Sequence, residues 1–184
     1  MNQSTALLRH AQHFFQNYLS RDRGLSPHTI LAYRDALKLF LLFAATFKSK
    51  SVSKLAMENL DVDTVLAFLR EIERTRKNSA VTRNLRLAAL KTFFSFLITQ
   101  DIVRASQYQR IISIPPKRET KPLMGYLEVK EVEIILDSIS KETALGQRDY
   151  VLLKFLYNTG SRVQEACDLS VRSFHLQGAP WVVI

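Results

Sequence analysis

Cysteine is nearly absent from this sequence of 184 residues, since only Cys167 carries a thiol. A single cysteine excludes an internal disulfide and any metal site built from several thiolates, and it suits a reducing compartment. Glycine and proline are scarce as well, with five of each, which favours long helices over a sheet sandwich with many turns. No apolar run approaches the roughly 20 residues of a membrane span, and the N-terminus lacks the layout of a signal peptide. We therefore expect a cytoplasmic, mainly α-helical protein without membrane contact.

Histidine is also rare, and the four histidines lack carboxylates at ligand spacing. Two of them are three residues apart, but no further ligand accompanies this pair. The sequence therefore predicts no metal site. The histidines are His10, His13, His28 and His175.

Positive charge is concentrated in the first two thirds of the chain. The net charge is +9, and residues 1–122 hold 20 Lys and Arg against 9 Asp and Glu, whereas residues 123–184 hold 6 against 8. A domain that neutralises the phosphates of a nucleic acid shows such an asymmetry. A basic excess that only improves solubility explains the charge, taken alone, equally well.

Four helical stretches are predicted over the first hundred residues. The first covers residues 5–19. Ser26 as the N-cap and Pro27 at the first helical position begin the second, which runs to about residue 47. The third begins near residue 61 or 63, and the fourth covers about 79–99. We predict a compact four-helix bundle within residues 1–105 as the economical architecture.

The second and fourth stretches combine an apolar face with polar or basic residues elsewhere on the helix. In the second, Arg34 and Lys38 lie one turn apart, away from the apolar stripe. The apolar face of the fourth is predicted to contain Leu85, Ala89, Phe93, Phe96 and Leu97. Its opposite side carries Ser79, Thr82, Arg83 and Arg86.

A basic segment rich in proline then separates two domains. The helical pattern fails from about residue 101, and three prolines with mixed charge predict a linker over 106–123. In the second domain, 124–184, helices are predicted over about 128–140 and 147–157. The latter is apolar nearly all round, so we expect it in the centre of a core, with Tyr150 and Tyr157. A strand over 181–184 is expected to lack its partners, so this domain looks incomplete.

Arg162 follows a tight turn at Gly160, beside a predicted helix start. Ser161 and Gln164 have the spacing of a capping box, which would make Ser161 the N-cap. The free N–H groups of a helix N-terminus attract anions, and an arginine fork binds phosphate oxygens. Glu165, three residues further, would orient the guanidinium from the same helix face. The pattern predicts a phosphate-binding corner, although an arginine near a helix start is more often a solvated side chain.

Three segments carry a resemblance to one family. The stretch from Arg148 to Leu169, with its Tyr-x-Thr-Gly-x-Arg-x-x-Glu core, is similar to the first conserved box of the tyrosine recombinases, or phage integrases. The segment from Leu25 to Tyr33 resembles the start of the core-binding domain of that family, and Thr82 to Phe94 resembles the last long helix of that domain. The resemblance covers essentially the whole chain.

The resemblance implies a fold and a chemistry. The fold would be an N-terminal four-helix core-binding (SAM-like) bundle, followed by the helical start of an α+β catalytic domain, truncated at a first β-strand. A tyrosine of the intact protein attacks a DNA phosphodiester, forms a 3′-phosphotyrosyl link and needs no cofactor. Arg162 matches an arginine that stabilises the transition state, and Glu165 its supporting acid. The expected partners are double-stranded DNA and, at full length, other protomers of a synaptic tetramer.

The resemblance also implies which residues hold DNA and which part of the machinery is missing. Two helices of the bundle would face the major groove, with phosphate contacts in the majority. The nucleophile and the later catalytic boxes are absent, so we expect this chain not to cleave DNA by itself. The predicted DNA-binding residues are His28, Thr29, Arg34, Lys38, Ser79, Thr82, Arg83, Arg86, Lys117, Arg118 and Lys121.

Three hypotheses remain open on the sequence. The chain is part of an active recombinase, or it is a module that occupies recombination sites without cutting them. In the third, it is a transcription regulator, with residues 164–174 as a helix-turn-helix. The third gives no role to the upstream bundle or to the Thr-Gly-x-Arg turn.

Overall fold

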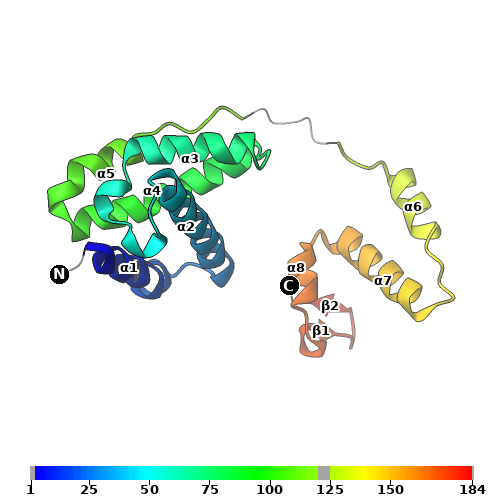
Figure 1. Cartoon of the computed structure of the whole chain (residues 1–184). Helices are drawn as coiled ribbons and strands as arrows, with labels where there is room; N and C mark the ends of the chain where they lie inside the picture. The colour runs from blue at the N-terminus through cyan, green and yellow to red at the C-terminus, as the bar shows by residue number, and fades with distance from the viewer. Residues whose placement is uncertain (1–2, 120–124, 184) are drawn as a thin grey trace. The chain divides into compact units, whose positions relative to one another are not determined.

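The computed structural model describes residues 3–119 and 125–183, and the chain divides into two compact units, Met1–Lys121 and Pro122–Ile184 (Figure 1). The first is helical throughout. Its main elements are α1 (Gln3–His13), the π-helix η1 (Phe14–Asp22), α2 (Pro27–Phe47), α3 (Val62–Arg74), α4 (Ala80–Gln100) and α5 (Ala105–Ile112). Single 3₁₀ turns occupy η2 (Val52–Lys54), η3 (Met57–Asn59) and η4 (Ile102–Arg104).

Side-chain caps fix where three of these helices begin. The backbone N–H of Thr29 donates to the Ser26 hydroxyl at 3.3 Å, and Pro27 occupies the first helical position of α2. The Ser79 hydroxyl caps α4 in the same way, accepting from Thr82 at 3.3 Å, and Asp61 caps α3. The predicted starts of the second and fourth stretches are therefore confirmed.

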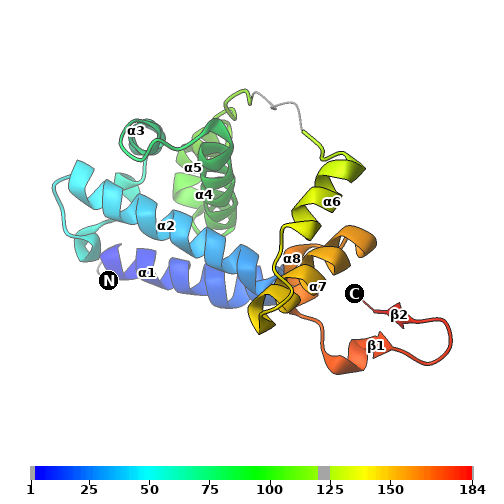
Figure 2. The same cartoon turned by 90° about the vertical axis from the view of Figure 1, so that its right-hand side faces the viewer.

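The core of the first unit is aromatic and is formed mainly by α2, α3 and α4. Phe40 of α2 packs edge-on against Phe68 of α3, with ring centroids 5.4 Å apart, and also against Phe94 of α4. All three side chains are almost fully buried, and each such burial contributes about 1.5–3 kcal/mol. Figures 1 and 2 both show α2 lying against α4.

Two expectations for the first unit were wrong. The predicted linker over 106–123 begins too early, because α5 packs on α4 and buries Tyr108 and Ile111. Leu85, expected on the apolar face of the fourth helix, is 66% exposed because it lines an unfilled groove between α2 and α4. Leu87 and Leu90 are buried on α4 in its place.

The first helix continues further than predicted. After α1 the chain forms the nine-residue π-helix η1, which ends at Asp22, and Gly24 then adopts a positive φ of 55°. Phe14 and Leu19 are both buried, although they are five residues apart. Phe14 packs against Phe93 of α4, with ring centroids 5.1 Å apart.

The second unit contains three helices and a short hairpin. The helices are α6 (Val129–Asp137), α7 (Ala144–Thr159) and α8 (Val163–Cys167). After the 3₁₀ turn η5 (Val171–Ser173), the strands β1 (Phe174–His175) and β2 (Trp181–Val182) form the hairpin. The two strands pair antiparallel, Phe174 with Val182 and His175 with Trp181, so the predicted strand does have a partner within the chain. Gly160 ends α7 in the predicted left-handed conformation, with φ 65°.

The expectation that the helix over 147–157 lies in a core was wrong. Among the described residues of this unit no side chain is fully buried, and Val151 and Tyr157 on α7 are 64% and 52% exposed. The cause is that α7 packs mainly against α6 and the short α8, with Phe155 also facing Phe174 of β1, which leaves much of its circumference uncovered. Tyr150 is half-buried, with the Lys141 ammonium 4.0 Å from its ring centroid.

Across residues 3–119 and 125–183, no helix is long and apolar enough to cross a membrane. The same residues contain no cluster of three or more His, Cys, Asp or Glu side chains placed to hold a metal ion.

Candidate nucleic-acid interface

A groove of about 710 Å³, termed here the α2–α4 groove, brings together residues predicted from two distant parts of the sequence. His28 and Thr29 line it from the first turn of α2, and Thr82 and Arg86 line it from the first two turns of α4. Four of the eight predicted helix residues therefore share one concave surface. Tyr33 and Leu85 form part of its apolar floor.

The two helices begin beside this groove with the same pattern of N-terminal hydrogen bonds. Each begins with a serine cap, and the threonine three residues later hydrogen-bonds back to it: Thr29 to Ser26 at 2.9 Å and Thr82 to Ser79 at 3.3 Å. Because the first N–H groups of a helix have no partner within the helix, two helix N-termini contribute partial positive charge to this part of the groove.

Three buried side-chain nitrogens in the described residues lack a hydrogen-bond partner, and all three lie near the start of α4. They are Asn78 Nδ2, Arg83 Nε and Arg86 Nη1. Every one is a donor, so the region lacks acceptors. Burial lowers the pKa of Arg86, and the positive charge of Arg76 lowers it further. Both effects would be relieved by an anion.

Arg34 and Lys38 lie apart from the other α2 candidates. They line a separate hollow of about 220 Å³, together with Ala11 and Phe15 from the first helical segment. Arg34 also forms an ion pair with Asp35 at 3.6 Å. The structure therefore divides the predicted residues of the second helix between two surfaces.

The predicted linker residues differ in how they are held. The Lys117 ammonium forms an ion pair with Glu73 at 2.7 Å, so its charge is already matched within the protein. The backbone of Lys117 is held by Asn84 of α4. Arg118 is exposed, and Lys121 lies outside the described residues.

Arg162 and Glu165 form a closed pair at the start of α8. The Arg162 N–H donates to Glu165 Oε2 at 2.7 Å, and Arg162 Nη1 donates to Glu165 Oε1 at 2.7 Å. These two hydrogen bonds lower the pKa of the Glu165 carboxyl. Arg162 itself occupies the N-cap position, so the predicted capping box of Ser161 and Gln164 was wrong by one residue. The sequence did not reveal this, because arginine is not a usual N-cap residue.

The helix-turn-helix hypothesis for residues 164–174 is contradicted. α8 ends at Cys167, and only the three-residue 3₁₀ turn η5 follows before β1 begins. A recognition helix has no place in such a segment.

Sequence reasoning missed Arg76 and Asn84. Arg76 lies in the turn after α3 and lines the α2–α4 groove, which no local pattern could reveal. Asn84 stands between two predicted DNA-binding residues in the sequence but contacts the chain 33 residues later. For Asn84, its place within the Arg-Asn-x-Arg segment of residues 83–86 was the only available signal.

Comparison with known proteins identifies the class to which this fold belongs. Residues 13–101 match the family model described as the phage integrase N-terminal SAM-like domain. This match, together with the helical bundle, confirms the predicted mainly α-helical fold. No solved structure gives a significant match.

Three relatives extend the similarity over most of the chain. Over 164 residues the chain is 38% identical to y4rD of Sinorhizobium fredii (strain NBRC 101917 / NGR234), a protein with the provisional description integrase/recombinase, covering 89% of this chain and 58% of that protein. It is 29% identical over 162 residues to tyrosine recombinase XerC of Staphylococcus haemolyticus, covering 88% of this chain and 51% of the relative. The identity to tyrosine recombinase XerD of Listeria monocytogenes serotype 4b is also 29% over 162 residues, covering 88% of this chain and 52% of the relative.

The chain belongs to the tyrosine recombinase, or phage integrase, family. It spans only 51% to 58% of the length of these three relatives.

Proposed function

We propose that this chain binds duplex DNA as part of a site-specific recombinase. In the intact protein, DNA is cleaved and rejoined through a 3′-phosphotyrosyl intermediate, and protomers act in a synaptic tetramer. The observation that carries the DNA-binding proposal is the α2–α4 groove, where two helix N-termini and the unpartnered donor of Arg86 meet. The strong positive charge of residues 1–122 supports the same partner.

In this proposal, α2 and α4 present their first turns to the DNA. Arg83 and Arg86 contact phosphates and fix the register of the protein on the duplex. His28 and Thr29, which are exposed or half-buried at the rim, are near enough to the helix start to reach a base edge or a second phosphate. Arg34, Lys38 and the linker cations add contacts outside the groove.

Arg162 and Glu165 have a different task in the intact recombinase. Glu165 holds one edge of the Arg162 guanidinium, and the remaining N–H donors stay free for the phosphate that is cleaved. The Arg162 side chain is 85% exposed, so a phosphate can approach it without rearrangement. The two hydrogen bonds between Arg162 and Glu165 orient the guanidinium, and they also lower the pKa of the Glu165 carboxyl.

Binding of a labelled duplex by the whole chain, measured by fluorescence anisotropy across a salt series, tests the proposal. We expect affinity to fall steeply with salt and to be lost in the double variant Arg83→Ala/Arg86→Ala. The matched control is Arg70→Ala/Arg74→Ala on α3, which removes the same charge from exposed positions. Equal losses in both double variants, or no binding by the folded wild-type chain at low salt, would contradict a specific DNA-binding face.

A module that occupies recombination sites without cutting them is the second candidate. It is favoured by the surroundings of Arg162, because no tyrosine hydroxyl among the described residues of the second unit hydrogen-bonds to its guanidinium. Incubating the chain with a nicked suicide duplex separates the two candidates. Binding without a covalent protein–DNA product supports the module, whereas a covalent product shows that the chain carries its own nucleophile.

A further inference from the structure

We infer that Arg76 and Arg86 form a subsite for one backbone phosphate of the DNA, within the α2–α4 groove. The inference rests on the proposed DNA-binding function and assigns a task to Arg76. The part of DNA that these two arginines take is a phosphodiester, and not the edge of a base.

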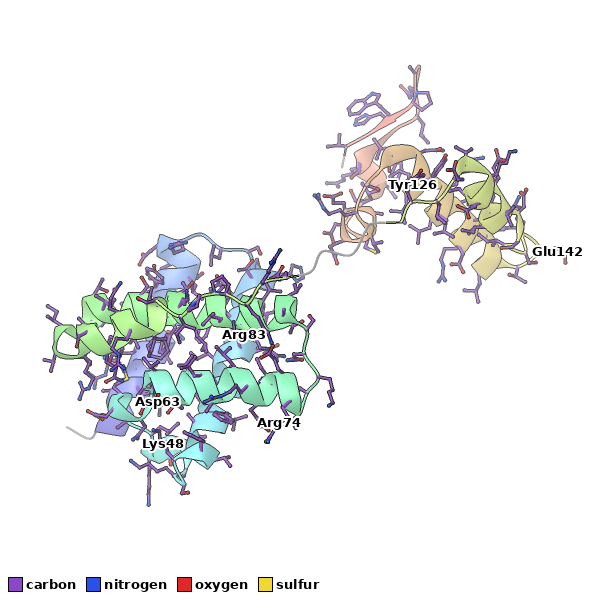
Figure 3. The ribbon with its side chains drawn as sticks, turned by 90° about the horizontal axis from the view of Figure 1, so that it is seen from above. Lys48, Asp63, Arg74, Arg83, Tyr126 and Glu142 are labelled. Carbon is purple, nitrogen blue, oxygen red and sulfur yellow. The ribbon has the colours of Figure 1, made fainter. Side chains whose placement is uncertain are left out.

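The turn after α3 places Arg76 on the wall of this groove. Lys77 adopts a left-handed φ of 53°, and the N–H of Asn78 donates to the carbonyl of Ile72 at 3.2 Å, which closes the helix end. Because the chain reverses here, Arg76 lines the same groove as Arg86, ten residues later. Figure 3 shows Arg74 near this end of α3 and Arg83 on the neighbouring α4.

Two guanidinium groups therefore share the groove without a matching anion. In the described part of the chain no carboxylate forms an ion pair with Arg76 or Arg86, although seven other Arg and Lys side chains there form such pairs with nearby acids at 3.6 Å or less. Asp35 also lines the groove, but it pairs with Arg34. The Nη1 atom of Arg86 is buried without a hydrogen-bond partner, and burial together with the positive charge of Arg76 lowers the pKa of Arg86.

A phosphate fits this arrangement better than a base. Its oxygens accept from two guanidinium groups at once, and its negative charge offsets the repulsion between them. An arginine that reads guanine extends freely into the major groove, whereas the Arg86 guanidinium is partly buried against its own protein. The Thr82 hydroxyl on the same wall offers a further hydrogen bond to a phosphate oxygen.

The test uses the full chain and three labelled duplexes, one AT-rich, one GC-rich and one of mixed composition. Arg76→Ala, Arg86→Ala and Arg86→Lys are compared with Arg74→Ala, a control whose guanidinium pairs with Glu71 at 3.0 Å. We expect Arg76→Ala and Arg86→Ala each to weaken binding roughly tenfold on all three duplexes. Each should also reduce the slope of log affinity against log salt by about 1. Arg86→Lys should keep most of the slope, and Arg74→Ala should change neither quantity.

The outcomes separate this inference from the proposed function. If the wild-type chain binds no duplex, the DNA-binding proposal fails and the subsite with it. If the wild type binds but Arg86→Ala weakens binding on one duplex only, or leaves the salt slope unchanged, the subsite is overturned and the DNA-binding proposal stands. Since Arg76 is an exposed turn residue, its substitution leaves the core intact, and unchanged binding by Arg76→Ala overturns the pairing of the two arginines.

Discussion

The side-chain amide of Asn84 pairs with the peptide group of Lys117 in both directions. Asn84 Oδ1 accepts from the Lys117 N–H at 2.9 Å, and Asn84 Nδ2 donates to the Lys117 carbonyl at 2.7 Å. Nδ2 also donates to a carboxylate oxygen of Glu119 at 2.8 Å. One side chain thus fastens the segment that leaves the first unit onto α4.

Removing this fastening should expose the segment around Lys117 to trypsin. In Asn84→Ala the segment loses three hydrogen bonds, so we expect cleavage after Lys117 or Arg118 to become several-fold faster while the helical content stays unchanged. Limited proteolysis followed by mass spectrometry measures this. Ser95→Ala, an exposed change on the same helix, is the control. Equal cleavage rates in wild type and Asn84→Ala would contradict the assignment.

The ionised carboxylate of Asp61 should stabilise the folded protein at neutral pH, and this contribution should be lost in acid. Partial burial opposes ionisation of Asp61, but hydrogen bonds from Lys48 at 2.8 Å and from Thr64 outweigh it, so its pKa is lowered. A carboxyl whose pKa is lowered on folding stabilises the folded state above its unfolded pKa, and this contribution is lost as the pH falls through the folded pKa. We expect Asp61→Ala to reduce the free energy of unfolding by about 1 kcal/mol at neutral pH, in urea titrations. The difference from wild type should shrink below about pH 4. A difference that is independent of pH would contradict the ionic contribution.

Ser49 occupies a position that glycine would fill better. It has a φ of 51°, and the N–H of Lys50 donates to the carbonyl of Ala45 at 2.8 Å, as in a helix end with a left-handed residue. Ser49→Gly should therefore raise the free energy of unfolding by about 1 kcal/mol. Ser51→Gly is the matched control, since Ser51 has a φ of −75° and glycine gains nothing there. A stability gain in the control, or none in Ser49→Gly, would rule out relief of backbone strain.

Tyr108 should make the protein sensitive to alkali. Its pKa is raised by burial and by its hydrogen bond to Asp101 Oδ2 at 3.0 Å. A phenol whose pKa is raised on folding stabilises the folded state below its unfolded pKa, so stability is lost as the pH rises above about 10. Tyr108→Phe should cost about 1 kcal/mol at neutral pH and should flatten the loss above pH 10. Unfolding followed by fluorescence at several pH values measures both, and a wild-type curve without an alkaline decline would contradict the prediction.

The parts of the fold that depend on neighbouring residues could be predicted from the sequence. Ser26 and Ser79 each cap a helix through a hydrogen bond to a residue only three positions later, so the starts of α2 and α4 could be predicted from the local sequence. α5 was not, because only Tyr108 and Ile111 of its eight residues are fully buried, which gives too short a pattern. The closeness of Arg76 and Arg86 depends on how α3, its closing turn and α4 pack, and such a contact has no local signal. The Arg162–Glu165 pair was predicted from its spacing, whereas the N-cap was misplaced by one residue.

The π-helix η1 has a consequence for how the first helical segment of this chain tolerates changes in its length. Phe14 and Leu19 both reach the core because hydrogen bonds in this segment span five residues, as between the Arg23 N–H and the Tyr18 carbonyl at 2.9 Å. A wide helical turn holds one residue more than an α-helical turn over the same rise. Deleting the exposed Gln16 would therefore tighten the segment into an α-helix while the side chains on either side keep their orientation toward the core. The first helical segment thus contains one residue more than an α-helix of the same length needs. Deleting one amino acid here should leave the residues before and after the deletion in their positions in the bundle.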